Sequence, residues 1–168
     1  QHTFLFGYEE SYGYLAGDFV RDKDAVQIAI ITAEMAAYYK SLGKTLSDVL
    51  NELYEQFGFY KEALVSLTFE GIEGQKKIAS IMEAVRKSPP TSIAHLNVLI
   101  VEDYIQGGVN GLPKADVVKL LLEEDTWICI RPSGTEPKIK FYIGVKQPSP
   151  EHSNALINQL KEALKTLY

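Results

Sequence analysis

The densest group of potential ligand-binding side chains lies in one short segment, Arg131-Pro132-Ser133-Gly134-Thr135-Glu136-Pro137-Lys138. The guanidinium of Arg131 can donate two parallel hydrogen bonds to a phosphate, and Lys138 could add a point charge. Ser133 and Thr135 supply hydroxyl donors. Gly134 permits a turn in which backbone N–H groups point at an anion. The segment is therefore predicted to bind phosphate, although Ser-Gly-Thr is also ordinary β-turn chemistry.

A second group of polar side chains lies near the start of the chain, in Gly7-Tyr8-Glu9-Glu10-Ser11-Tyr12-Gly13-Tyr14. Carboxylates accept hydrogen bonds from neighbouring sugar hydroxyls, and a serine can add another. Glu9 and Ser11 are therefore candidates for binding a sugar. On composition alone, a solvated acidic turn is the alternative.

A third, shorter group of charges is Arg21-Asp22-Lys23-Asp24, just before an apolar stretch. The ammonium of Lys23 could pair with an anion. Asp22 or Asp24 could instead cap the following helix, because an Asp side chain accepts hydrogen bonds from the first free N–H groups. Both roles can hold together.

The elements around the first two groups follow from hydrophobic spacing. A short strand is expected at residues 4–6, and a helix at 25–40 that is apolar nearly all round and should therefore be buried. Gly43 suits the end of that helix, and Thr45 with Asp48 suits the start of another. That second helix has one apolar stripe and ends at Gly58.

The pattern changes after residue 58. Alternation predicts a half-buried strand at 63–70, and helical spacing follows until Ser88-Pro89-Pro90. Further strands are expected at 96–101, 127–130 and 139–146, and residues 116–124 fit either a strand or a helix. A helix at 151–167 turns Leu156, Leu160, Leu164 and Leu167 inward.

Two units result, split near residues 58–62. Residues 1–58 read as a strand, a loop and two helices, with too little sheet to stand alone. Residues 59–168 read as a complete α+β domain of about four antiparallel strands and two helices. The chain opens without Met in an apolar run, so we expect a piece cut from a longer protein.

Composition narrows the class of protein. A formal charge of −5 argues against a general nucleic-acid binder, which needs a basic excess. The single cysteine, Cys129, excludes an internal disulfide and a cysteine metal site, and it is expected to be a packed thiol. The longest apolar run is too short and too polar to span a bilayer, and no signal peptide is visible. A cytoplasmic location is the default expectation.

The string RPSGTEPK resembles the phosphate-binding loop of the α-D-phosphohexomutase superfamily, which comprises phosphoglucomutases, phosphomannomutases and phosphoglucosamine mutases. In that family the loop lies in the fourth and last domain. Residues 7–14 resemble the sugar-binding G-E-x-S-G loop of the third domain, and the two motifs occur in the family's order. The resemblance assigns sugar hydroxyls to Glu9 and Ser11 and the sugar phosphate to Lys23. It marks Glu10 as typical of the glucose-preferring branch, while Tyr8 and Tyr12 depart from the usual motif.

The resemblance implies the C-terminal part of a phosphoglucomutase, an intramolecular phosphotransferase that interconverts glucose 1-phosphate and glucose 6-phosphate. The family's phosphoserine and its D-G-D-x-D Mg²⁺ loop belong to earlier domains, and neither occurs in this sequence. We therefore expect no catalytic residue, no metal ligand and no cofactor in this chain, with Mg²⁺ bound elsewhere and glucose 1,6-bisphosphate as the intermediate. The expected partners are a hexose phosphate and the N-terminal domains of the parent, without nucleic acid or membrane. A phosphomannomutase, a phosphopentomutase-like relative and a stand-alone phosphosugar-binding module are the alternatives.

Overall fold

The computed structural model describes residues 3–9 and 12–168. Contacts divide the chain into two compact units, Gln1–Gln56 and Phe57–Tyr168. The first unit carries the candidate sugar-binding segment, and the second carries the candidate phosphate loop.

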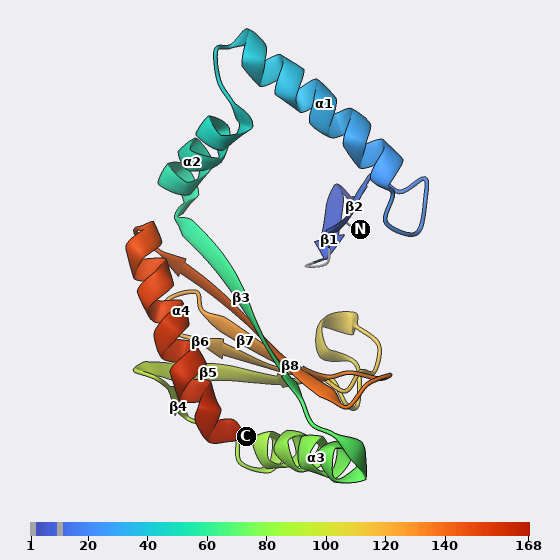
Figure 1. The fold of residues 1–168 in the computed structure, drawn as a ribbon, viewed down its shortest axis with the longest axis vertical. Coiled ribbons are helices and arrows are strands. Elements are labelled where there is room, and N and C mark those ends of the chain that lie inside the picture. The colour runs from blue at the N-terminus through green and yellow to red at the C-terminus, as the bar shows by residue number, and fades with distance from the viewer. Residues whose placement is uncertain (1–2, 10–11) are drawn as a thin grey trace. The chain divides into compact units, whose positions relative to one another are not determined.

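The first unit begins with an antiparallel hairpin of β1 (Phe6–Glu9) and β2 (Gly13–Ala16), followed by α1 (Ala25–Ser41) and α2 (Leu46–Phe57), whose last residue falls in the second unit (Figure 1). The two predicted helices are confirmed. A strand is present, but it lies at residues 6–9 instead of the expected 4–6 and continues past Gly7. The region expected to be a loop contains β2 in addition, because residues 13–16 pair with β1.

The boundaries of both helices lie at the capping residues that the sequence predicts. Asp24, not Asp22, caps α1, and its carboxylate accepts hydrogen bonds from the N–H groups of Val26 and Gln27 at 3.0 and 3.2 Å. Gly43 adopts a φ of +74° just after α1, a conformation that favours glycine. Thr45 and Asp48 exchange hydrogen bonds at the start of α2 in a capping box.

The expectation that the 25–40 helix is buried is wrong in this structure. None of the residues of α1 is buried, and Val26, Ile30 and Tyr38 are among its exposed apolar side chains. An apolar surface on all sides shows what a helix can bury, but actual burial depends on the elements around it. The two-stranded hairpin of this unit is too small to cover a helix of 17 residues.

The second unit is a six-stranded sheet in which every neighbouring pair is antiparallel, in the order β3-β8-β7-β6-β5-β4 (Figure 1). Its strands are β3 (Phe59–Thr68), β4 (Ser92–Ile93), β5 (Leu96–Asp103), β6 (Val118–Leu122), β7 (Trp127–Pro132) and β8 (Lys138–Gln147). Its helices are α3 (Gly71–Lys87), α4 (Pro150–Leu164) and the short 3-10 turns η1 (Val109–Gly111) and η2 (Lys165–Leu167).

The predicted α+β class of this unit is confirmed, with two strands more than the four expected. The ambiguous stretch at 116–124 holds β6, where Val118, Leu120 and Leu122 point to the core. The other addition, β4, has only two residues and is too short to show a period.

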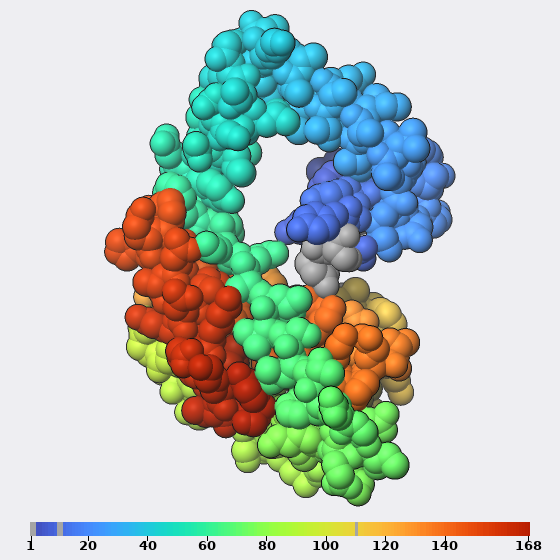
Figure 2. All heavy atoms as spheres, in the orientation of Figure 1, coloured from blue at the N-terminus to red at the C-terminus, as the bar shows by residue number. Residues whose placement is uncertain are grey.

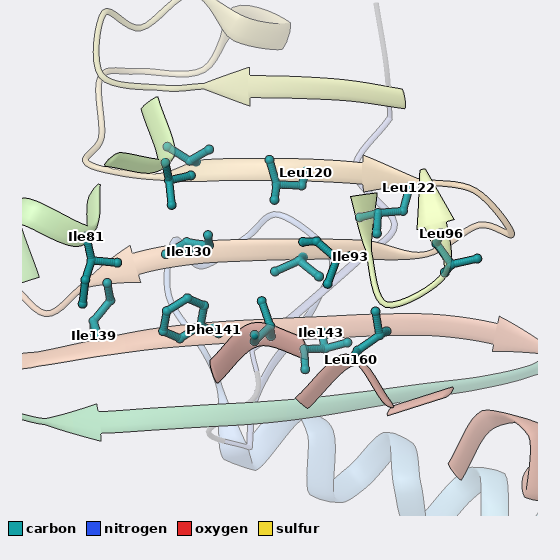
Figure 3. Packing of buried hydrophobic residues seen from close by; sticks show 14 of the residues in the cluster. Ile81, Ile93, Leu96, Leu120, Leu122, Ile130, Ile139, Phe141, Ile143 and Leu160 are labelled. Carbon is teal, nitrogen blue, oxygen red and sulfur yellow. The ribbon is translucent and has the colours of Figure 1, made fainter. Parts of the chain in front are cut away.

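The core lies between one face of the sheet and helices α3 and α4. Figure 3 shows Ile130, Phe141 and Ile143 of adjacent strands packed with Leu160 of α4, and all four are fully buried. On the surface, α4 lies beside β3 (Figure 2). Ser153 of α4 donates a hydrogen bond to the Phe59 carbonyl at 2.8 Å, which joins this helix to the edge strand.

The start of α3 packs closely on the chain that supports the phosphate loop. Gly74 is buried, and a Cβ there would lie 2.5 Å from the carbonyl oxygen of Phe69. Phe69 in turn donates its N–H to the Pro137 carbonyl at 2.9 Å, within the loop. The fold therefore positions the loop through a contact that only glycine permits.

We predict that Gly74→Ala lowers the free energy of unfolding by about 1–3 kcal/mol through overpacking. Elsewhere in a helix, alanine would be favoured over glycine by about 1 kcal/mol. Urea-induced unfolding checks this. Ser80→Ala, on the exposed side of the same helix, is the control and should change stability by less than about 0.5 kcal/mol. A Gly74→Ala variant more stable than the wild type would show that the contact with Phe69 is not tight.

Candidate functional site

The candidate phosphate loop connects two adjacent strands of the sheet. β7 ends at Pro132 and β8 begins at Lys138. The Ser133 N–H donates to the Lys138 carbonyl at 2.8 Å, and the Lys138 N–H donates to the Glu136 carbonyl at 2.7 Å. With the bond from Phe69 to the Pro137 carbonyl, these contacts hold the base of the loop against the sheet.

The side chain of Ser133 organises the interior of the loop. Its Oγ accepts hydrogen bonds from the N–H groups of Thr135 and Glu136 at 3.4 and 3.3 Å. Both distances are long for N–H···O bonds, so they are weak. Because the Ser133 oxygen accepts both bonds, its hydroxyl proton remains available for donation.

Gly134 does not adopt the left-handed backbone conformation that only glycine takes easily. Its φ is not among the positive values of this chain, so the backbone adopts no left-handed turn there. A Cβ at this position would meet no atom within 4 Å. Gly134 therefore contributes open space in front of the loop rather than a special backbone conformation.

Three cations lie around this loop. Arg131 is exposed at the end of β7, and its cross-strand neighbour on β8 is Lys140. Lys138 forms an ion pair with Glu136 at 2.9 Å, so that carboxylate would compete with a phosphate for the ammonium. Sequence reasoning missed Lys140. The alternation of β8 could have identified it, since residues 138 and 140 share a face when Ile139 and Phe141 are buried.

The candidate sugar-binding segment includes the facing ends of β1 and β2. Glu9 on β1 lies opposite Gly13 on β2. A Cβ at Gly13 would lie 2.7 Å from Glu9 Oε1 and 2.5 Å from Lys23 Cγ. The missing side chain of Gly13 therefore provides the space in which Glu9 and Lys23 meet.

Lys23 joins the hairpin to the segment before α1. Its ammonium lies 2.9 Å from Asp22 and 3.6 Å from Glu9. The pKa of Lys23 is raised, mainly by its hydrogen bond to Asp22 and then by the charges of Asp22 and Glu9. In turn, the hydrogen bond to Lys23 lowers the pKa of Asp22. The Asp24 N–H donates to the Tyr14 carbonyl at 3.0 Å, which fixes the segment beside β2.

Glu9 and Lys23 line a small surface cavity of about 230 Å³ together with Phe4, Gly7, Tyr8, Leu15, Arg21 and Asp22. The cavity combines a carboxylate and an ammonium with apolar walls, which suits a polyhydroxylated ligand bearing an anionic group. Ser11 and Glu10 lie outside the described residues. The structure therefore brings together Glu9 and Lys23 of the predicted sugar-binding set.

The described residues contain no group of three or more His, Cys, Asp or Glu that could hold a metal ion. The two aspartates nearest the candidate site have other roles, since Asp22 pairs with Lys23 and Asp24 caps α1. Cys129 lies on β7 and is only partly buried, and this burial raises the pKa of its thiol. No helix among residues 3–9 and 12–168 is long and apolar enough to cross a membrane.

We predict that Gly13→Ala separates Glu9 from Lys23, because the added methyl group would occupy the space where they meet. The loss of nuclear Overhauser contacts between the two side chains measures this. Gly7→Ala, in the same hairpin, is the matched control, since its Cβ would lie 3.4 Å from Phe4, an ordinary contact. Retained Glu9–Lys23 contacts in Gly13→Ala would refute the steric role of Gly13.

Comparison with known proteins places both motifs in one family. Residues 1–57 match the family model for phosphoglucomutase/phosphomannomutase, alpha/beta/alpha domain III, and residues 76–163 match that for the phosphoglucomutase/phosphomannomutase C-terminal domain. A phosphoglucomutase of Staphylococcus haemolyticus (strain JCSC1435) is 46% identical over 153 residues, which are 85% of this chain and 28% of that protein. One of Staphylococcus aureus (strain MRSA252) is 43% identical over 166 residues, 93% of this chain and 30% of that protein.

A solved structure shows the same fold. The open form of the exocytosis-sensitive phosphoprotein pp63/parafusin, a phosphoglucomutase from Paramecium, superposes with a TM-score of 0.64 at 18% identity, covering 94% of this chain and 29% of that one. The chain thus spans less than a third of the length of these relatives. Since the C-terminal-domain model alone matches more than half of the 168 residues, this chain belongs to the phosphoglucomutase/phosphomannomutase family.

Proposed function

We propose that the chain is the C-terminal part of a phosphoglucomutase, an intramolecular phosphotransferase that interconverts glucose 1-phosphate and glucose 6-phosphate. The observation that carries the proposal is the Arg131–Lys138 loop, which gathers cations and hydroxyls on a rigid sheet end. The proposal is also supported by relatives at 43–46% identity that are named phosphoglucomutase.

In this proposal the second unit holds the phosphate that does not react. Arg131, Lys138 and the hydroxyls of Ser133 and Thr135 bind its oxygens, and the space at Gly134 admits it close to the backbone. We add Lys140 to this set, because the strand register places it opposite Arg131. Phosphoryl transfer depends mostly on positioning and charge neutralisation, and this loop would supply both.

The first unit would hold the sugar. Glu9 and Ser11 accept and donate hydrogen bonds to ring hydroxyls that are common to both binding orientations. Lys23, held beside Glu9, reaches the sugar phosphate. Because such contacts must serve both the 1-phosphate and the 6-phosphate, they bind the ring rather than either reacting end.

The reaction itself would need parts of the parent protein beyond this chain. We place the phosphoserine and the Mg²⁺ in that part of the parent protein. Glucose 1,6-bisphosphate is the proposed intermediate, and the N-terminal domains are the proposed partners. Residues 1–58 would belong to the third domain and 59–168 to the fourth, in a cytoplasmic enzyme, and the chain alone would be inactive.

We predict that Arg131→Ala weakens binding of glucose 1-phosphate by about 30-fold, because a charge-assisted bidentate partner contributes about 2 kcal/mol. Backbone amide NMR shifts of the 168-residue chain, titrated with glucose 1-phosphate, measure the affinity. Wild-type shifts should cluster at residues 131–138. Lys77→Gln, which removes an exposed charge of α3, is the control and should bind like the wild type.

The same titration separates the branches of the family. Mannose 1-phosphate should shift the phosphate loop equally but perturb Glu9 less than glucose 1-phosphate does. An equal or stronger response of Glu9 to mannose 1-phosphate would favour a phosphomannomutase. No shift of the phosphate loop with either sugar at high millimolar concentration would remove the proposed role of the loop in this chain.

We predict that Gly134→Ala leaves stability within about 0.5 kcal/mol of the wild type, since the methyl group meets no atom. Phosphate binding should nevertheless weaken by about tenfold, because the methyl group fills the space through which an anion approaches the backbone. Thermal unfolding and the titration above measure the two effects. Unchanged affinity would mean that the phosphate does not approach the loop at Gly134.

A further inference from the structure

The face of the second-unit sheet that points away from α3 and α4 carries an unusual set of charges. The structure describes every residue of strands β3 and β5–β8, and register and alternation place five basic and two acidic side chains of these strands on this face. The basic ones are Lys119, Arg131, Lys138, Lys140 and Lys146, and the acidic ones are Glu62 and Glu102. The whole chain has a formal charge of −5. Among these strand residues positive charge exceeds negative charge, and Lys138 and Lys146 each pair with an acidic side chain of an adjoining loop, Glu136 and Asp125. We call this face of the sheet the open face.

The open face is continuous with the phosphate loop. Arg131 and Lys138 belong to both. Lys119 belongs to the open face alone, one strand further from the loop. It is the direct β6 neighbour of Cys129, and Arg131 lies two residues beyond Cys129 on β7. Such diagonal positions place Cβ atoms about 7–8 Å apart.

A second observation indicates that the charges of Lys119 and Arg131 act in the same place. Burial raises the pKa of the Cys129 thiol, and the positive charges of Lys119 and Arg131 both oppose that rise. The thiol therefore lies in the field of both cations. An anion at the Arg131 end of the loop would feel the same combined field.

The position of Lys119 is maintained by its neighbours. Its ammonium lies 5.7 Å from the centroid of the Trp127 ring, within cation–π distance. The Trp127 ring itself lies against Gly144, where a Cβ would come within 2.2 Å of an indole atom. Glu102, the β5 neighbour of Lys119, accepts a hydrogen bond from the Tyr104 hydroxyl at 2.9 Å. The Trp127 contact holds the ammonium beside the ring, and Lys119 as a whole is only partly exposed.

We propose that Lys119 attracts the anionic phosphate ester across the open face of the sheet and strengthens its binding at the Arg131 loop through its charge, without touching it. This inference rests on the proposed function of the loop. Electrostatic attraction of this kind depends on the sign of the charge rather than on the shape of the side chain, and salt weakens it. Both properties distinguish it from a hydrogen bond.

The test uses the 168-residue chain, inorganic phosphate as the probe, and the amide shifts of the loop as the readout, at ionic strengths of 50 and 500 mM. At the lower value, Lys119→Gln should weaken binding about two- to fivefold and Lys119→Glu by about the square of that factor. Lys119→Arg should bind like the wild type. At the higher value all variants should agree within about 1.5-fold, because the Debye length falls to a few ångströms.

Lys77→Glu is the matched control, since it reverses a charge on α3, which covers the other face of the sheet. Thermal unfolding of each variant shows whether loss of the Trp127 contact affects folding. Equal affinity of Lys119→Glu and wild type at low ionic strength would overturn the inference, and so would a loss that persists at 500 mM. If either of these results occurs and Arg131→Ala still abolishes phosphate binding, the proposed function is kept and only the role of Lys119 is lost. If wild type does not bind phosphate at all, the proposed function itself fails.

Discussion

The antiparallel pairing of β7 with β8 is the constraint on which the rest of the second unit depends. Its two-residue period sends Ile130 and Phe141 into the core under the helices and turns Arg131 and Lys140 to the opposite face. A shift of β8 by one residue would turn Lys140 into the core and expose Phe141. The apolar packing that stabilises the domain therefore also determines where its positive charges lie.

The phosphate loop is the short connection between these two strands, and its internal bonds are of two kinds. Bonds from Ser133 to Lys138 and from Phe69 to Pro137 are short and hold the base of the loop. The bonds that Ser133 Oγ accepts, and the ion pair of Lys138 with Glu136, involve groups that an anion could take over. A firm base with exchangeable contacts at the tip suits a loop that binds and releases a phosphate ester in each cycle.

The first unit obtains its local geometry differently, since it has little sheet and no buried residue on its helices. In this unit, close contacts between the hairpin and the segment before α1, rather than a buried core, fix the positions of the side chains. Gly13 leaves space for Glu9 and Lys23, and the Asp24 cap with its bond to Tyr14 aligns the start of α1 with the hairpin. The apolar side chains of α1 stay exposed within this unit, and the chain spans 28% of the length of the Staphylococcus haemolyticus relative.

The sequence by itself predicted the helices and their ends, most of the main strands, the family and a candidate phosphate loop. These depend on local signals: hydrophobic period, capping residues such as Asp24 and Gly43, and an eight-residue motif. Only the tertiary structure decided which aspartate caps α1, that β6 is a strand, that α1 is exposed, and that Gly134 has open space around it without a left-handed φ. It alone brought Lys140 and Lys119 beside Arg131, because strand register joins residues that are distant in the chain. Such neighbours are set by the packing of whole strands, which no short stretch of sequence encodes.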